Sequence, residues 1–176
     1  MDHIGKYKVL GELGRGAMGI VYQGEDPVIG RPVALKTIRF DVLSGKADRE
    51  NAQRRFMREA RSAGSLSHSN IVTIYDVGED AGLTFIAMEY ISGQSLEDML
   101  GSGTFFCSLE QAMDLMERLG SALDYAHRKG VIHRDIKPAN ILIDSEGQPF
   151  LVDFGIARVA ASTTGHRPCW PTPCVE

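Results

Sequence analysis

Short apolar and β-branched runs, separated by glycine and proline, dominate the first ninety residues and predict β-strands. The predicted strands are residues 7–13, 20–24, 33–38, 71–77 and 83–90. Residues 49–65 follow a different pattern, because Phe56, Ala60 and Ala63 recur at intervals of three or four with arginines between them. That spacing predicts an amphipathic helix. The first half of the chain is therefore expected to be mostly sheet with one long helix.

Helical patterns replace the strand patterns beyond residue 91. Ser95 can cap a short helix that ends near residue 100. Ser108 and Gln111 form a capping box, and the long helix that it opens is expected to end at Gly130. The apolar face of that helix comprises Leu109, Ala112, Met113, Met116, Leu119, Leu123 and Ala126. Two short strands, residues 141–143 and 150–152, are expected to form a hairpin after a polar loop.

The composition of the 176-residue chain is that of a globular protein, with 43% hydrophobic and 24% charged residues. Nineteen basic and twenty-three acidic side chains give a net charge of −4, which argues against a dedicated nucleic-acid-binding protein. Three cysteines are too few for a disulfide framework and favour a reducing compartment. No apolar run reaches the ~18–20 residues that span a bilayer, and the N-terminus lacks the apolar core of a signal peptide. A cytoplasmic protein without a membrane segment is expected.

A glycine-rich segment lies between the first two predicted strands, with Gly14, Gly16 and Gly19 as its glycines. Glycines let the backbone approach a polyphosphate closely, because no side chain intervenes. The pattern alone also fits a hairpin that binds no ligand. A dinucleotide-binding fold requires a helix after the glycines, whereas residues 20–24 continue as a strand, so that fold is not supported.

Lys36 lies among apolar residues in the predicted strand 33–38. A buried ammonium group is costly unless it is paired, and a carboxylate and a phosphate are suitable partners. Glu59, on the apolar side of the helix 49–65, can supply the carboxylate. Taken alone, a lysine on an edge strand that extends to water is the more common situation.

The polar loop before the predicted hairpin holds Asp135, Lys137 and Asn140, and Asp153 follows the hairpin. The hairpin can bring Asn140 and Asp153 to the same place. Their oxygens suit Mg²⁺, which binds few protein ligands and retains waters and substrate phosphates. Asp135 can then face a substrate hydroxyl, and Lys137 can reach the phosphoryl group that is moved.

In their order along the chain, these segments resemble the signature of the eukaryotic-type (Hanks-type) serine/threonine protein kinases: glycine loop, lysine strand, catalytic loop and Asp153-Phe154-Gly155. The amino-acid sequences of residues 55–60 and 130–143 resemble those of the bacterial members of this family. The resemblance covers roughly residues 7–163. It implies an α+β, two-lobed kinase fold, with a complete small β-rich lobe over residues 1–90 and an incomplete helical large lobe over 91–165. The Pro/Cys-rich tail 166–176 resembles nothing in the family.

The resemblance also implies how ATP is held. Lys36 would bind the α- and β-phosphates and form an ion pair with Glu59. Met88 would be the gatekeeper beside the adenine pocket. The implied ATP-binding residues of the glycine loop, adenine pocket and hinge are Leu13, Gly14, Gly16, Gly19, Val21, Ala34, Met88, Glu89, Ile91 and Leu142.

For the transfer itself, the resemblance implies Asp135 as the catalytic base and Lys137 as the group that steadies the γ-phosphate. Asn140 and Asp153 would hold Mg²⁺. Lys137 is typical of serine/threonine rather than tyrosine kinases, and Arg134 is typical of kinases whose activation segment is ordered by phosphorylation.

The implied function is transfer of the ATP γ-phosphoryl group to serine or threonine hydroxyls of a protein, with Mg²⁺ as cofactor and no nucleic-acid partner. A homodimer through the small lobe is also expected. The family's large lobe continues beyond the point where the resemblance ends, so a truncated domain is expected. The alternative is a catalytically inactive remnant that binds only nucleotide or a partner, or that does not fold stably.

Other features have plainer interpretations. Residues 31–61 hold nine basic and four acidic side chains, and a solvated helix face is a commoner explanation than a binding patch. Cys169 and Cys174 supply only two of the four ligands that structural zinc requires. His68 and Cys107 are interpreted as structural residues.

Overall fold

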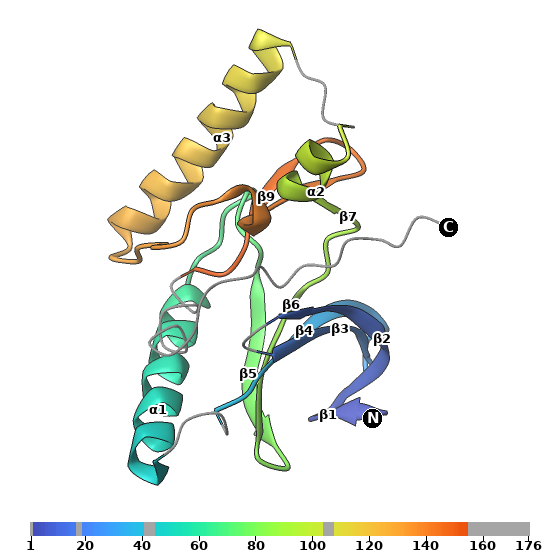
Figure 1. Ribbon diagram of the computed structural model, residues 1–176, viewed down its shortest axis with the longest axis vertical. Helices are drawn as coiled ribbons and strands as arrows, with labels where there is room; N and C mark the ends of the chain where they lie inside the picture. Colours follow the sequence, from blue (N-terminus) through green and yellow to red (C-terminus); the bar gives the residue numbers. More distant parts are fainter. Residues whose placement is uncertain (1, 17–18, 41–44, 104–107, 155–176) are drawn as a thin grey trace.

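The computed structural model describes residues 2–16, 19–40, 45–103 and 108–154. Six antiparallel strands form one sheet in the order β1-β2-β3-β4-β6-β5 (Figure 1). They are β1 His3–Ile4, β2 Tyr7–Gly16, β3 Gly19–Asp26, β4 Arg31–Ile38, β5 Ile74–Asp80 and β6 Leu83–Glu89. Helix α1 (Lys46–Ala63) lies alongside β5. The predicted strands and the long helix are confirmed, with the strand predicted at 71–77 displaced toward the C-terminus.

The predictions on Cys107, Gly155, Cys169, Cys174 and the tail 166–176 lie outside the described residues.

One large side chain anchors α1 to the sheet. The buried residues of this helix are Ala52, Phe56, Ala60 and Ala63. The Phe56 ring packs edge-on against Phe40 with 5.8 Å between ring centroids, and it belongs to the same core cluster as Val21 and Ile86. Alanine side chains let the helix backbone approach the sheet, but they bury little area. Phe56 therefore supplies most of the apolar surface that α1 buries.

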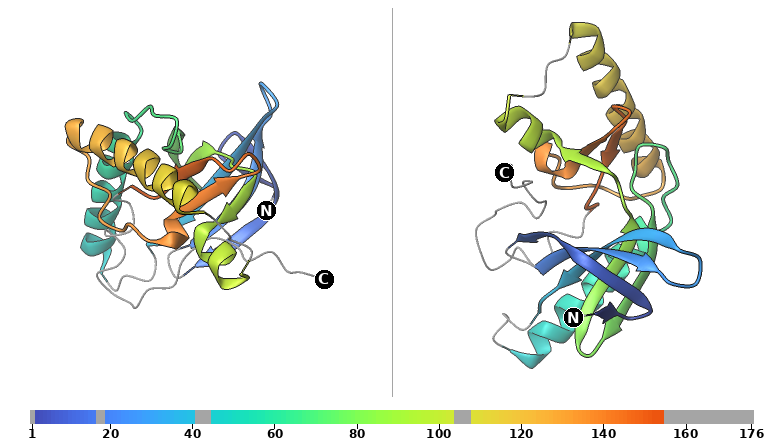
Figure 2. Two further views of the ribbon diagram at one scale, coloured as in Figure 1. Left: turned by 90° about the horizontal axis from the view of Figure 1, so that it is seen from above. Right: turned by 90° about the vertical axis from the view of Figure 1, so that its right-hand side faces the viewer.

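The second part of the chain forms a smaller antiparallel sheet with helices beside it. Its elements are β7 Gly93–Ser95, α2 Leu96–Gly101, α3 Leu109–Arg128, the 3-10 turn η1 Pro138–Asn140, β8 Ile141–Asp144 and β9 Pro149–Leu151. Figure 2 shows α3 and this sheet at one end of the molecule and the six-stranded sheet at the other. The predicted α+β, two-lobed architecture is confirmed.

The helix ends follow the local sequence signals. The Ser95 hydroxyl accepts a backbone N–H of α2, and Ser108 and Gln111 make both hydrogen bonds of the predicted capping box on α3. Gly130 adopts a φ of +76° just after α3, a left-handed conformation in which glycine carries little strain. Its position ends the helix as predicted.

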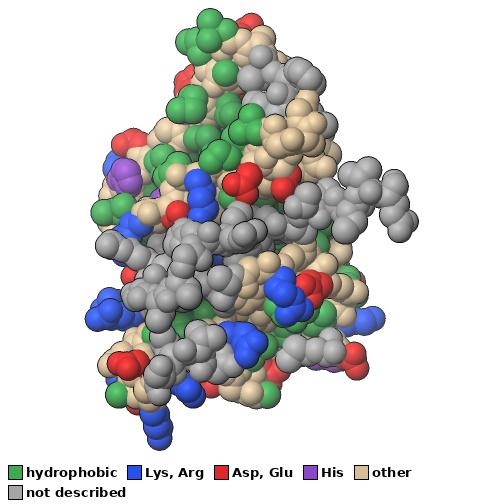
Figure 3. All heavy atoms as spheres, in the orientation of Figure 1, with side chains coloured by type: hydrophobic (Ala, Val, Ile, Leu, Met, Phe, Trp, Pro, Cys, Tyr) green, Lys and Arg blue, Asp and Glu red, His purple; other side chains and the backbone are tan. Residues whose placement is uncertain are grey.

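Only part of the predicted apolar face of α3 is buried. Leu119, Ala122 and Ala126 are buried near the C-terminal end. By contrast, Leu109, Met113 and Met116 are 79%, 64% and 68% exposed. Figure 3 shows hydrophobic side chains gathered on the surface over α3. The periodicity identifies the apolar stripe correctly, but burial requires a neighbour, and the described residues cover only one half of the helix.

Core residues from both lobes meet between the two sheets. One buried cluster contains Val21, Ala34 and Met88 from the large sheet together with Leu142 and Val152 from the second part of the chain. The apolar interior therefore runs continuously from one lobe to the other. Among the helices that the structure describes, none is both long enough and apolar enough to cross a membrane.

Candidate functional site

An apolar cluster lies where the two lobes meet. It brings together the residues predicted around adenine: Val21, Ala34, Met88, Ile91 and Leu142 are buried members, and Leu13 packs against them. The sheet register explains part of this grouping, because Ala34 on β4 is paired with Met88 on β6. Glu89 ends β6, next to the connection that leads to Ile91 and β7. Residues far apart in the sequence therefore form one apolar surface between the lobes.

The three predicted phosphate-loop glycines lie at the β2–β3 connection. Gly14 is paired with Val21, and Gly16 with Gly19, in the antiparallel ladder of these strands. A strand therefore follows the glycines, which excludes the helix that a dinucleotide-binding fold would need. This hairpin connection lies on the same two strands that contribute Leu13 and Val21 to the apolar cluster.

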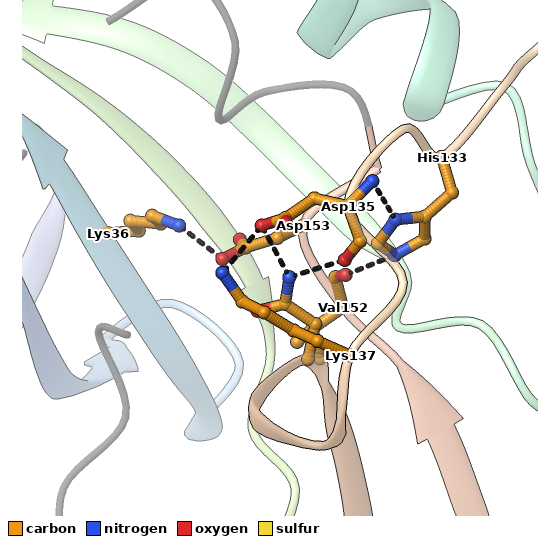
Figure 4. A network of polar contacts seen from close by, with 7 residues as sticks. Lys36, His133, Asp135, Lys137, Val152 and Asp153 are labelled. Carbon is orange, nitrogen blue, oxygen red and sulfur yellow. Dashed lines mark hydrogen bonds and ion pairs between the residues drawn. The ribbon is translucent and has the colours of Figure 1, made fainter. Parts of the chain in front are cut away.

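Lys36 has a different carboxylate partner from the one predicted. Its Nζ lies 2.5 Å from Asp153 Oδ2, and the two side chains are only 7% and 11% exposed (Figure 4). The buried ammonium group is thus paired, as expected, and the alternative in which it extends to water is wrong. The loop after β9 supplies the counter-charge, whereas the sequence suggested α1.

Glu59 instead faces Arg134, with 3.3 Å between Oε1 and the Arg134 Nη1. Its other oxygen, Oε2, is buried and has no hydrogen-bond partner among the described residues. The predicted Lys36–Glu59 ion pair is therefore absent from this structure. The physical reason is competition, because Lys36 is already paired with Asp153, and Arg134 is paired with Glu59.

Asp135 lies at the centre of a second polar group. Its Oδ2 is 2.8 Å from Lys137 Nζ and accepts a 2.9 Å hydrogen bond from Asn140 Nδ2. The same amide nitrogen donates to the Asp135 carbonyl at 2.8 Å. These contacts, drawn in Figure 4, fix the carboxylate against both of its polar neighbours. The Asp135 side chain remains partly exposed, so an acceptor group can reach it.

Asn140 and Asp153 are close enough in the fold to act together. The backbone N–H of Val152 donates to the Asn140 carbonyl at 3.1 Å. Asp153 is the next residue after Val152, so its backbone lies close to Asn140. Asn140 uses Nδ2 for its contacts with Asp135, so its Oδ1 is the atom that could coordinate a cation. One amide oxygen and one carboxylate match the small set of protein ligands that Mg²⁺ takes alongside phosphates and water.

The sequence analysis did not identify His133, which joins the two functional loops. Its Nε2 donates to the Val152 carbonyl at 2.8 Å, and its Nδ1 accepts the Asp135 N–H at 3.3 Å. The ring also packs against Phe154, with 4.6 Å between centroids. Both nitrogens are used, so the neutral Nε2–H tautomer is the one that fits. The available signal was a histidine directly after two apolar residues and two positions before Asp135.

Burial lowers the pKa of the His133 imidazole below its ordinary value. Above the unfolded-state pKa of about 6.5, both states are neutral and the group has no effect on stability. As the pH falls below that value, the unfolded chain takes up the proton first, so the free energy of unfolding should decrease. The decrease should be at most about 1.4 kcal/mol per pH unit.

Urea denaturation at several pH values between about 7.5 and 5 should measure this effect. The loss of stability on acidification is expected to be smaller in His133→Phe, which cannot titrate. His127→Phe, at an exposed position of α3, is the matched control and should retain the wild-type slope. An unchanged slope in His133→Phe would contradict the assignment.

Two residues of the site have an unusual backbone. Arg134 and Asp153 adopt φ values of +68° and +65°, in the left-handed region that residues other than glycine rarely enter. Such conformations cost about 1–3 kcal/mol each and concentrate at functional sites. Here they orient the two side chains that form the cross-lobe ion pairs with Glu59 and Lys36.

Comparison with known proteins agrees with this geometry. A family model described as protein kinase domain matches residues 7–173. The serine/threonine-protein kinase PrkC of Bacillus subtilis (strain 168) is 44% identical over 160 residues, which cover 91% of this chain and 24% of that protein. The probable serine/threonine-protein kinase SCO3848 of Streptomyces coelicolor is 44% identical over 158 residues, covering 88% and 23% respectively. The chain thus spans about a quarter of the length of these relatives.

Solved structures show the same fold. The kinase domain of Mycobacterium tuberculosis PknI is similar with a TM-score of 0.74 and 33% sequence identity, over 88% of this chain and 62% of that one. The apo form of PpkA-294 is similar with a TM-score of 0.78 and 26% identity, over 89% and 60%.

Proposed function

This chain belongs to the protein kinase family, and from that premise we propose that it transfers the γ-phosphoryl group of ATP to serine or threonine hydroxyls of proteins. The observation that carries the proposal is the convergence of Lys36, Asp135, Lys137, Asn140 and Asp153 beside one apolar cluster. That combination supplies a base, cations for phosphate and oxygen ligands for a metal at the edge of a surface suited to a purine.

We assign the predicted roles to these residues as part of the proposal. Phosphoryl transfer passes through a loose, in-line transition state, so catalysis consists mainly of positioning and charge stabilisation. Asp135 orients the acceptor hydroxyl and accepts its proton. Lys137, whose Nζ lies 2.8 Å from that carboxylate, stabilises the negative charge on the transferred phosphoryl group. Lys36 binds the α- and β-phosphates.

Asn140 and Asp153 are the residues that would hold Mg²⁺. The metal would supply positive charge that neutralises the phosphate oxygens. Adenine would contact the apolar cluster formed by Val21, Ala34, Leu142 and their neighbours. The buried members of this cluster offer the apolar surface that a nucleotide base requires.

A nucleotide-binding protein that does not transfer the phosphoryl group is the second candidate. It is favoured by the observed partners of Lys36 and Glu59, because an active kinase site needs these two residues paired with each other. The two candidates share the binding step and differ only in turnover.

The proposal also covers the domain organisation, the partners and the cellular location. We divide the chain into a small lobe over residues 1–90, a partial large lobe over 91–165 and a separate tail over 166–176. We further propose that the acceptor is a protein, that the chain forms a homodimer through the small lobe, and that it is located in the cytoplasm. The net charge of −4 supports the omission of nucleic acid as a partner.

Binding of Mg²⁺-ATP tests the site. Lys36→Met and Asp153→Ala are each expected to weaken the affinity for a fluorescent ATP analogue by about 10–100-fold, because each removes a charged contact to the nucleotide or its metal. Lys8→Met, at an exposed position of β2, is the matched control and should bind as the wild type does. Omission of Mg²⁺ should lower the ATP affinity of the wild type far more than it lowers the ATP affinity of the Asp153→Ala variant. Equal affinity in all variants would contradict the proposed site.

A further inference from the structure

One side of α1 carries arginines that the proposed reaction does not use. Arg54, Arg58 and Arg61 follow one another at intervals of four and three residues, so they lie on one face of the helix. They line an open groove of about 640 Å³ between α1 and β5. The other residues of this α1 groove are Gln53, Met57, Ser62, Ser65 and Glu79.

The charges in the α1 groove are largely uncompensated. Arg58 and Arg61 are exposed, and no carboxylate in the described part of the chain forms an ion pair with either of them. Arg54 donates to the neutral Asn51 side chain at 2.8 Å. Glu79, the acidic residue of the groove, accepts a 2.7 Å hydrogen bond from Gln53. The groove is therefore a positive region in a chain whose net charge is −4.

The spacing of the arginines matches an extended peptide. Arg54 and Arg58 are separated by about 6 Å along the helix axis, at 1.5 Å per residue. Alternate side chains of an extended strand point the same way and recur about every 6.6–6.8 Å. Acidic residues at alternate positions of a peptide can therefore meet Arg54 and Arg58. Arg61 lies about 4.5 Å beyond Arg58 along the helix axis and can contact the same peptide through its long side chain. Met57, half-buried in the groove, offers apolar contact to the aliphatic part of such a peptide.

We propose that the α1 groove binds an acidic, extended peptide segment of a partner protein. Charge complementarity favours this occupant, since guanidinium groups bind carboxylates through paired hydrogen bonds. A nucleic acid is also an anion, and the oligonucleotide in the test below distinguishes it from the peptide. Figure 3 shows Lys and Arg side chains at the lower left of the molecule, over α1. This binding is independent of the proposed phosphoryl transfer, because none of the groove residues belongs to the nucleotide site.

Fluorescence anisotropy with a short labelled peptide that carries glutamate at every second position tests the proposal. Arg58→Ala combined with Arg61→Ala is expected to weaken binding by about 10-fold, from two exposed ion pairs of up to about 1 kcal/mol each. Arg55→Ala changes an arginine of the same helix that does not line the groove, and it should change the affinity by less than about 2-fold. Binding should also weaken as salt is raised.

A charge exchange separates a direct contact from a loss of structure. Replacing both Arg58 and Arg61 by glutamate should abolish binding of the acidic peptide and create binding of the corresponding lysine peptide. Three results would overturn the proposal. The wild type could fail to bind the acidic peptide; Arg55→Ala could weaken binding as much as the double variant; or a single-stranded oligonucleotide of equal charge could bind more tightly than the peptide through Arg58 and Arg61.

Discussion

Replacing Asp135 by asparagine is expected to lower phosphoryl transfer by about 10²–10⁴-fold, which is the usual contribution of a general base. Asparagine keeps the size of the side chain and an oxygen that can accept from Lys137 and Asn140, so the local contacts should persist. What it loses is the ability to take the proton of the acceptor hydroxyl. That proton moves in the transition state, and the affinity for Mg²⁺-ATP should therefore remain about unchanged.

The measurement is transfer of labelled phosphate from ATP to a generic basic protein, followed by analysis of the phosphorylated amino acids. Asp124→Asn removes a carboxylate of similar type from the exposed side of α3, and it should retain the wild-type rate. The label should appear on serine or threonine. A wild-type rate in Asp135→Asn would contradict the assigned base, and phosphotyrosine as the main product would contradict the serine/threonine specificity.

Phe56→Ala should produce the largest loss of stability, about 3–5 kcal/mol. The side chain is almost fully buried, and the other buried residues of α1 are alanines that cannot fill the cavity. Since domains are stable by only about 5–15 kcal/mol, this loss removes a large share of the stability and should loosen the packing of α1 on the sheet. ATP binding should weaken with it, because Val21 and Ile86 share the same core cluster.

Urea denaturation followed by circular dichroism measures the change, with the slope of the transition checked for constancy. Leu10→Ala is the control, because Leu10 is half exposed on β2 and its truncation should cost about 0.5 kcal/mol or less. A Phe56→Ala protein as stable as the Leu10→Ala protein would mean that α1 is held by contacts other than this ring.

Much of the fold could be predicted because its signals are local. The capping box at Ser108 and Gln111 and the stop at Gly130 depend on neighbours a few residues away, and the structure contains both. The strands follow for the same reason, since their apolar runs end at glycine and proline. Helix burial was harder to predict. The stripe on α3 is continuous in sequence, but only the neighbours in space decide that Leu119 is buried and Met116 is exposed.

The partners of charged groups depend on distant parts of the chain. The sequence could show that the buried Lys36 ammonium group needs a carboxylate partner. It could not decide between Glu59 and Asp153, because each of them carries a carboxylate. The choice between them depends on the position of α1 relative to the loop after β9, and on Arg134 competing for Glu59. His133 was missed for a related reason. Its function is to connect two loops, and that connection exists only after the chain has folded.

The ion pair between Lys36 and Asp153 has a consequence for synthesis on the ribosome. The two residues are 117 positions apart, so at about 5–20 residues per second Asp153 is added roughly 6–23 s after Lys36. All six strands of the large sheet have been made well before then, since β6 ends at Glu89. The small cavity beside Lys36 is lined partly by Leu151, Val152 and Phe154, which are made at the same time as Asp153. The residues that bury the ammonium group and its counter-charge therefore emerge together, and the nascent sheet can close before them without leaving a buried, unpaired lysine, which would cost several kcal/mol.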